Sequence, residues 1–260
     1  MIKSVLTVIL LLLLPTKVKA SNISDLINKT TVYLIETWNS DKNLKDWYAP
    51  QVITVQRGTK LYGGGCKGAN SGIDVAGSYY CDPNHTIVLD SDELKAFVKV
   101  FGNASIAYVI SHEFAHALQN ALGVDLKNPN HELQADCLAG YFINRGNKEL
   151  GITREGILEM SSAAYSIGSK THGTGAQRAY ALLSGMGRVD SSCSLQSINK
   201  LVEGKINDPL YKAFKKTRGS GKNVDLESST YKKDAAGLLG INLKSLSPKI
   251  KYKFWYECLN

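Results

Sequence analysis

Several features are missing from this 260-residue sequence. It has no internal repeat, which excludes solenoid and propeller architectures. After the first twenty residues no second long apolar run follows, so no other segment is a candidate membrane span. None of the five cysteines forms a Cys-x-x-Cys pair, which excludes the common zinc site built from such pairs. The chain has only five histidines, and this small number limits the choice of any imidazole ligand.

The first twenty residues differ from the rest of the chain. A lysine near the start precedes a run of apolar residues, and Val18 and Ala20 stand at the small-residue positions of a cleavage site. We therefore predict a signal peptide at 1–20, cut after Ala20, with export to the periplasm or the extracellular space. Because Lys17 and Lys19 crowd the cleavage region, an uncleaved membrane anchor is the alternative.

The rest of the chain divides at a polar segment. About 43% of all residues are hydrophobic, which is enough for a core, and we predict one domain at 21–216. A basic extension at 217–260 follows it. From Gln196 to the end there are 13 Lys and Arg against six Asp and Glu, out of a formal net charge of +8 for the chain. Such a tail can contact an anionic membrane or cell wall, or only solvate the surface; nucleic acid is not expected for an exported protein.

The periodicity of apolar residues predicts an α+β fold, in which a small early sheet packs on later helices. Asn103 and Gly123 are the expected caps of the most apolar helix, and Thr174 with Gln177 fits a capping box. The segment 61–84 is rich in glycine and is expected to be a loop. Expected helices cover 24–38, 103–123, 130–146, 154–168 and 174–187, and expected strands cover 51–56 and 85–90.

A His-Glu-x-x-His motif lies in the most apolar of these helices. Each helical residue advances about 100°, so His116 lies near 40° and Glu113 near 100° from His112, and all three can face one cavity. Two imidazoles one turn apart can bind one zinc ion, which lowers the pKa of a bound water molecule. Glu113 can then act as a general base and later as an acid. The alternative is an ordinary solvated helix face.

The residues around this motif argue against a solvated face. The helix is apolar nearly all round, so we expect it to be buried, and a buried His-Glu-His set needs partners because unpaired polar groups are costly. The next helix offers a third metal ligand in Glu132. Asp136 lies one turn later and can orient a ligand imidazole. His131 points about 100° away from Glu132 and is a poorer ligand.

The motifs in series resemble the bacterial neutral zinc metallopeptidase family. "HEFAH" followed by "ELQADCLAG", the two-cysteine segment "GCKGANSGIDVAGSYYCDPNHTIVLD" and "THGTGAQR" carry the resemblance, which covers roughly residues 50–195. It implies a zincin-like fold with one Zn²⁺ per chain. The implied zinc ligands are His112, His116 and Glu132, and the implied catalytic acid and base is Glu113. These are the residues that helix geometry also selects.

The same resemblance implies two disulfides, Cys66 with Cys81 and Cys137 with Cys193, and leaves Cys258 as the odd thiol. His172, in the Thr-His-Gly segment, is a candidate catalytic donor to the oxyanion that peptide hydrolysis forms. A structural histidine bonded to backbone is the alternative there. For Arg178 we expect a buried salt bridge rather than contact with substrate.

The sequence thus predicts an exported zinc-dependent peptidase that acts on peptides or proteins. Two alternatives remain open at this point. One is a zinc hydrolase of non-peptide bonds, such as amides of the cell wall, and the other is a non-catalytic extracellular protein with a structural zinc ion. The strand at 85–90 is either an exposed edge that aligns an extended substrate or an internal strand. No oligomeric state follows from the sequence.

Overall fold

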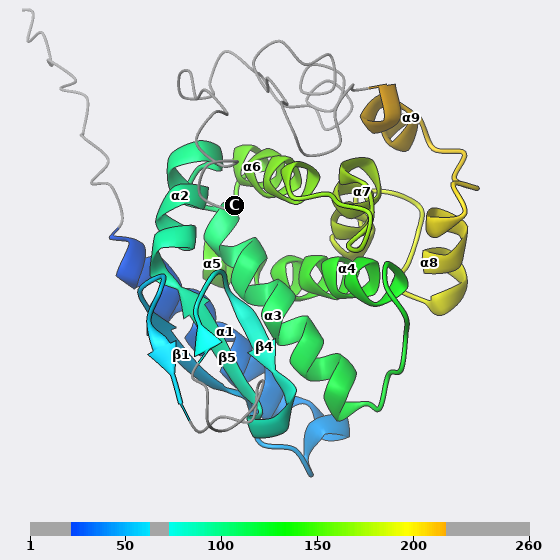
Figure 1. Ribbon diagram of the computed structural model, residues 1–260. Coiled ribbons are helices and arrows are strands. Elements are labelled where there is room, and N and C mark those ends of the chain that lie inside the picture. Colours follow the sequence, from blue (N-terminus) through cyan, green and yellow to red (C-terminus); the bar gives the residue numbers. More distant parts are fainter. Residues whose placement is uncertain (1–21, 63–72, 217–260) are drawn as a thin grey trace, which may run out of the picture.

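The computed structural model describes residues 22–62 and 73–216 and has the α+β architecture that the sequence predicts (Figure 1). Helix α3 runs between a small sheet on one side and a group of helices on the other. The strands are β1 (Gln51–Val55), β2 (Lys60–Leu61), β3 (Ile73–Asp74), β4 (Tyr79–Cys81) and β5 (Thr86–Asp90). The helices are α1 (Ile23–Ser40), α2 (Ser91–Phe101), α3 (Ser105–Ala121), α4 (Asn130–Arg145), α5 (Asn147–Leu150), α6 (Arg154–Ser166), α7 (Gly175–Gly185), α8 (Leu195–Val202) and α9 (Pro209–Lys216).

The main sheet has the strand order β1-β5-β4. β1 runs parallel to β5, with Gln51 opposite Thr86, and β4 runs antiparallel to β5, with Tyr79 opposite Val88. All five residues of β5 are buried, as expected for a strand with a neighbour on each side. The strand predicted at 85–90 is therefore the internal strand of the sheet. The predicted loop at 61–84 instead contributes β4, which lies at the edge of this sheet in the described chain.

Helix α3 is buried on nearly every side, as its apolar composition predicts. It contacts α1, α2, α4, α6 and the sheet, and 13 of its 17 residues are buried. Its start differs from the prediction, because Ala104 rather than Asn103 occupies the cap position and makes no side-chain cap bond. The backbone N–H of Ala104 donates instead to the carboxylate of Glu159 on α6 at 3.0 Å. A tertiary contact thus satisfies the N–H of the cap residue, and the next three N–H groups donate to backbone carbonyls of residues 102–104.

Helices α4 and α7 pack with their backbones in contact. A Cβ atom on Gly140 would overlap the carbonyl oxygen of Leu182, and one on Gly185 would overlap that of Cys137. The predicted capping box of Thr174 and Gln177 begins α7. Because α4 carries residues of the metallopeptidase motif, this close packing brings side chains of α7 next to them.

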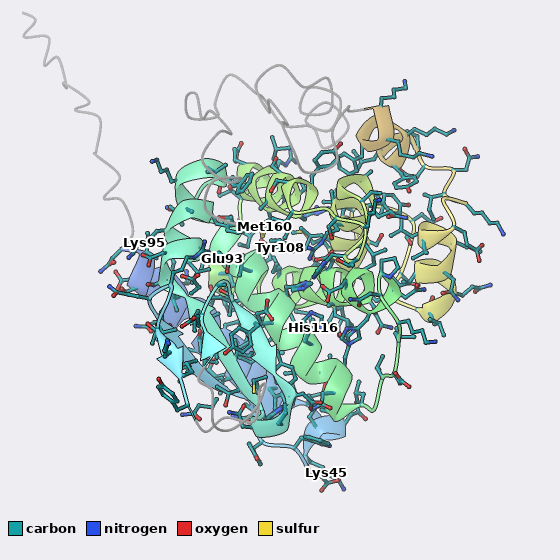
Figure 2. All side chains as sticks on the ribbon, viewed as in Figure 1. Lys45, Glu93, Lys95, Tyr108, His116 and Met160 are labelled. Carbon is teal, nitrogen blue, oxygen red and sulfur yellow. A yellow bond between two sulfur atoms is a disulfide. The ribbon has the colours of Figure 1, made fainter. Side chains whose placement is uncertain are left out.

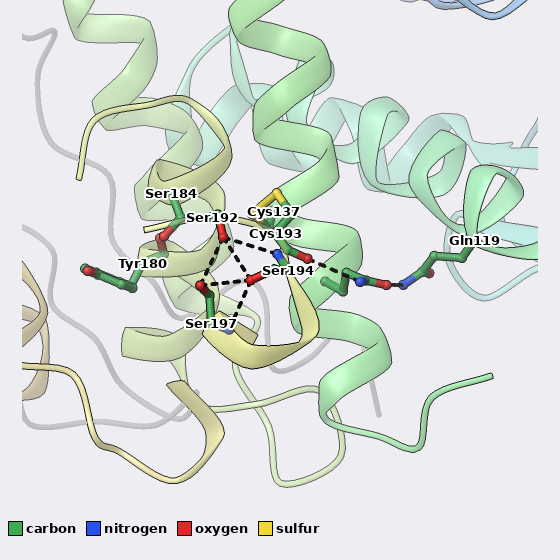
Figure 3. Close-up of a disulfide and its surroundings, with 9 residues drawn as sticks. Gln119, Cys137, Tyr180, Ser184, Ser192, Cys193, Ser194 and Ser197 are labelled. Atoms are coloured by element: carbon green, nitrogen blue, oxygen red, sulfur yellow. Dashed lines mark hydrogen bonds between the residues drawn. A yellow bond between two sulfur atoms is a disulfide. The ribbon is translucent and has the colours of Figure 1, made fainter. Parts of the chain in front are cut away.

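A disulfide joins Cys137 on α4 to Cys193 in the segment before α8, which is the pairing that the family resemblance implies (Figure 3). Cys66 and Cys258 lie outside the described residues, so the pairing of Cys66 with Cys81 stays a prediction. The expected signal segment and basic extension also lie outside them. Among the described helices, none combines the length and the apolar character that crossing a bilayer requires.

Candidate metal centre

Three potential metal ligands converge where α3 and α4 meet. The Nε2 atoms of His112 and His116, one turn apart on α3, are 3.1 Å from each other. Oε2 of Glu132, in the first turn of α4, lies 3.3 Å from Nε2 of His112 and 3.7 Å from Nε2 of His116. Figure 2 shows His116 on the stretch of α3 that faces α4. In the described part of the chain, this trio is the group of His, Cys, Asp and Glu residues that is placed to hold a metal ion.

The spacing of these atoms fits a zinc ion. Zinc binds His nitrogen and carboxylate oxygen at about 2.0–2.2 Å with tetrahedral geometry, which places neighbouring ligand atoms about 3.3 Å apart. The three observed distances of 3.1, 3.3 and 3.7 Å bracket that value. Three ligand atoms in this arrangement leave the fourth tetrahedral position for another molecule, as in catalytic zinc sites.

The protonation states of His112 on α3 and Glu132 on α4 depend on each other. Burial alone would lower the pKa of His112, but the charge of Asp136 and the side-chain contacts with Asp136 and Glu132 raise it to about 10. Burial alone would raise the pKa of Glu132, but its contacts with His112 and His116 hold it below its usual range. A metal cation bound here would replace the protons of the imidazoles, whose positive charge stabilises the carboxylate of Glu132.

A buried charged network lies behind His112. Asp136 is fully buried, and its Oδ1 atom lies 2.9 Å from Nδ1 of His112, although the ring is not aligned for a full hydrogen bond. Arg178 on α7 donates to both carboxylate oxygens at 2.8 and 2.9 Å, and the hydroxyl of Tyr108 donates at 2.8 Å. Burial alone would raise the pKa of Asp136, but the charges of Arg178 and His112 lower it. Arg178 thus forms the expected buried salt bridge.

Glu113 lies beside the trio in a cavity of about 830 Å³. Its side chain is buried, at 7% exposure, but reaches the cavity wall together with both histidines and Glu132. The volume lies in the range of sites that bind small molecules or short peptides. The position of Glu113 on α3 follows from helix geometry, because the residue after His112 is rotated by about 100° toward the open side of the site.

His172 lies at the rim of this cavity, in the loop before α7. Its Nδ1 atom is 2.8 Å from the hydroxyl of Thr171 and 3.0 Å from that of Ser169, and its Nε2 atom is 3.9 Å from Oε2 of Glu132. Burial is the main cause that lowers its pKa. The hydroxyl groups of its own loop thus hold one ring nitrogen, and the other nitrogen faces the metal centre.

The remaining two histidines have other surroundings. The ring of His131 stacks on that of His116, with centroids 4.8 Å apart and an interplanar angle of 24°. His85 is buried among aromatic rings, where its Nδ1 atom lies 2.7 Å from the hydroxyl of Tyr80 and its Nε2 atom lies 3.0 Å from the carbonyl oxygen of Tyr48. Neither belongs to the trio, as the helix geometry predicts for His131.

Two polar residues of the site, Gln119 and Glu93, are not among those predicted from the sequence. Gln119 on α3 accepts a hydrogen bond from Nδ1 of His116 at 2.9 Å, and its position three residues after that histidine is the signal that could have found it. Glu93 on α2 also lines the cavity (Figure 2). Burial raises the pKa of Glu93 to about 7, although the backbone N–H of Ser78 donates to its carboxylate at 2.7 Å. No local pattern marked Glu93.

Comparison with known proteins gives relatives but no solved structure. The family model described as "Putative neutral zinc metallopeptidase" matches residues 19–191. The chain is 27% identical to the uncharacterized protein YpfJ of Escherichia coli K12 over an alignment of 201 residues. This alignment covers 63% of this chain and 67% of YpfJ. It is also 34% identical to the uncharacterized protein Rv2575 of Mycobacterium tuberculosis H37Rv over an alignment of 93 residues. That alignment covers 30% of this chain and 31% of Rv2575. No solved structure matches at a significant level.

The family match spans well over half of the chain and contains the whole site. It runs from before α1 to beyond α7, so it includes the metal-ligand trio, Glu113, His172 and the buried network around Asp136. Three ligand atoms spaced as a zinc ion requires agree with a family described as zinc metallopeptidases. This chain therefore belongs to the neutral zinc metallopeptidase family.

Proposed function

We propose that the chain is a zinc-dependent peptidase that hydrolyses peptide bonds in peptides or proteins. The observation that carries the proposal is the convergence of His112, His116 and Glu132 at 3.1–3.7 Å, with Glu113 in the same cavity. Three protein ligands with a free fourth position are typical of catalytic zinc sites, whereas structural sites have four protein ligands. A carboxylate beside that position is what general acid and base catalysis requires.

The side chains of the cavity have distinct roles in this proposal. A zinc ion, when bound, supplies Lewis acidity that polarises a peptide carbonyl and acidifies water. Glu113 takes a proton from the attacking water and passes it to the leaving amine, because its carboxylate lies in the cavity beside the metal ligands. His172 directs Nε2 toward the same space, so it can donate a hydrogen bond to the oxyanion.

The residues behind the ligands keep His112 in position. Asp136 lies against Nδ1 of His112, which leaves Nε2 toward the metal position, and Arg178 and Tyr108 hold Asp136 in turn. Histidine ligands commonly present their second nitrogen to a carboxylate, which orients the ring and increases its basicity. The network therefore holds His112 in its ligand orientation before a metal ion binds.

The sheet beside the site has an edge to which an extended substrate can bind. β4 is an edge strand in the described chain, and its residues Tyr79 and Tyr80 line the cavity. An extended peptide can pair with such an edge through backbone hydrogen bonds, which would lay it across the site. We therefore propose β4, and not the internal strand β5, as the edge that aligns a substrate.

We also propose that the protein acts outside the cytoplasm. The signal-like segment at 1–20 supports export, and the Cys137–Cys193 disulfide supports an oxidising compartment, because such bonds are rare in the reducing cytosol. The basic residues of 217–260 would favour contact with an anionic membrane or wall.

The first experiment measures zinc content and hydrolysis in the purified full chain and in Glu113→Gln. We expect about one zinc per chain in both proteins, with hydrolysis of unstructured peptides by the parent protein alone, because the glutamine keeps the shape of Glu113 but cannot accept a proton. The control is Glu36→Gln, which changes an exposed glutamate of α1 and should leave both readouts unchanged.

Three results would contradict the proposal. Full-rate hydrolysis by Glu113→Gln would exclude Glu113 as the base. Zinc uptake together with cleavage of wall amides, but of no peptide, would favour the non-peptide hydrolase. Absence of zinc after purification without chelators would exclude a zinc-dependent peptidase.

A further inference from the structure

Gln119 makes a complete set of buried hydrogen bonds beside the metal centre. Its side chain is fully buried on α3. Oε1 lies 2.9 Å from Nδ1 of His116, and Nε2 donates to the carbonyl oxygen of His131 at 2.9 Å and to Oε1 of Gln134 at 3.1 Å. A primary amide has two N–H donors, and both are used here.

These partners fix which way the amide of Gln119 faces. The carbonyl oxygen of His131 can only accept, so the –NH₂ group of Gln119 must point toward it and Oε1 must point toward His116. An amide oxygen cannot donate, so the proton of a neutral His116 ring must reside on Nδ1. Its Nε2 atom then keeps a lone pair, and that atom is the one that faces His112 and Glu132.

The chain of hydrogen bonds continues to the disulfide. Oε1 of Gln134 accepts from Gln119, so its own –NH₂ group is the donor, and it donates to the carbonyl oxygen of Cys193 at 3.2 Å. Cys193 is joined to Cys137 on the same helix as Gln134. Figure 3 shows this path from Gln119 to the disulfide. The orientation of Gln134 is therefore set by a backbone segment that a covalent bond ties to α4.

We propose that Gln119 is the positioning residue of His116, and that Gln134 and the disulfide-linked segment at Cys193 hold Gln119 in its orientation. The proposal rests on the proposed zinc function and assigns how the second histidine ligand is prepared for the metal. The two histidines are held differently: His112 faces the buried carboxylate of Asp136, whereas His116 faces a neutral amide.

The test has two measurements on the full-length protein. Zinc affinity is measured by competition with a chromophoric chelator. The Nδ1–H signal of His116 is measured by NMR in the zinc-loaded, ¹⁵N-labelled protein. In Gln119→Leu we expect zinc affinity to fall about 10- to 100-fold, and the Nδ1–H proton to exchange faster with water because it has lost its acceptor. Gln119→Glu keeps an acceptor for Nδ1 of His116 but loses the donors to His131 and Gln134, so its Nδ1–H proton should exchange more slowly than that of Gln119→Leu. Gln134→Leu removes one of two anchors and should weaken zinc binding less than Gln119→Leu.

Gln177→Leu is the matched control. Gln177 is also a buried amide with hydrogen bonds to backbone carbonyls, at Leu201 and Val202, but it does not contact His116. We expect it to lower the melting temperature and leave the Nδ1–H signal of His116 unchanged. Equal zinc affinity and equal exchange in Gln119→Leu and the parent protein would overturn the proposal, as would the same change of both readouts in Gln177→Leu.

The failure of the proposed function would be seen separately. If the parent protein binds no zinc, the proposed function fails, and the inference drawn from it falls with it. If the parent protein binds zinc and Gln119→Leu binds it equally well, the zinc function stands and only the role of Gln119 is overturned.

Discussion

Replacement of Asp136 by asparagine should be among the most damaging isosteric changes in this protein. The carboxylate has no contact with solvent, and it neutralises Arg178, whose exposure is only 3%. Asparagine keeps the size of the side chain but removes the charge, so the guanidinium remains buried without a counterion. Breaking a buried ion pair from one side costs about 3–5 kcal/mol. That is a large part of the roughly 5–15 kcal/mol that stabilises a typical domain.

The measurement is urea unfolding of the metal-free protein in the presence of a chelator, which removes any contribution of zinc to stability. At pH 7 we expect Asp136→Asn to be less stable than the parent protein by about 3–5 kcal/mol. Asp92→Asn is the matched control, because Asp92 forms an exposed ion pair with Lys95 at a similar distance of 2.9 Å. Exposed pairs of this kind contribute little, so this control should unfold like the parent protein.

The dependence of this difference on pH gives a second check. The folded protein holds the pKa of Asp136 below its unfolded value, so the stabilising contribution is present above about pH 4 and is lost as the pH falls through the folded pKa. The gap between parent and variant should therefore close in acid. A gap below about 1 kcal/mol at pH 7, or a gap that stays constant into acid, would refute the reasoning.

Three other changes test separate features of the fold. Glu93→Gln should unfold like the parent protein near pH 4 but be more stable than it at pH 8, by up to about 3 kcal/mol. The reason is that the pKa of Glu93 is raised to about 7 in the folded protein, so ionisation of this buried group destabilises the fold as the pH rises. Equal urea midpoints at pH 8 would contradict this. Gly185→Ala should cost about 1–3 kcal/mol or more in the same assay, because the methyl group overlaps the carbonyl of Cys137, whereas Gly77→Ala should be tolerated. Replacing Cys137 and Cys193 together by alanine opens a crosslink with a sequence separation of 56 and should cost about 4 kcal/mol; an unchanged melting temperature in calorimetry would show that the crosslink does not constrain the unfolded chain.

Much of the metal centre could be predicted from local sequence, because helix geometry relates residues one turn apart. His112, Glu113 and His116 had to share one side of α3 once that segment formed a helix, and the structure places them there. Glu132 followed from the need for a third ligand on the next helix, and the structure brings it to the two histidines. The positions of α1, α3, α4, α6 and α7, the capping box of α7 and the buried character of α3 also follow from periodicity and local hydrogen bonding, whereas α2, α5, α8 and α9 were not predicted.

The tertiary structure alone decided which distant groups complete these local patterns. Glu159 on α6 accepts from the backbone N–H of Ala104 at the start of α3, and β4 rather than β5 forms the edge beside the site. Glu93 reaches the cavity, and Gln119 faces His116 because the start of α4 presents a carbonyl oxygen to its amide.

The physical reason is that periodicity and capping depend on residues close together in the sequence, whereas tertiary contacts join residues far apart in it. Periodicity states which face of a helix is apolar, but it does not state which helix will cover that face. Asp136 could be selected from the sequence as a partner of a ligand histidine, because it lies one turn after Glu132 on the same face of one helix. The pairing of its carboxylate with Arg178 on α7 depends on the close approach of two helix backbones at Gly140 and Gly185, which only the folded chain determines.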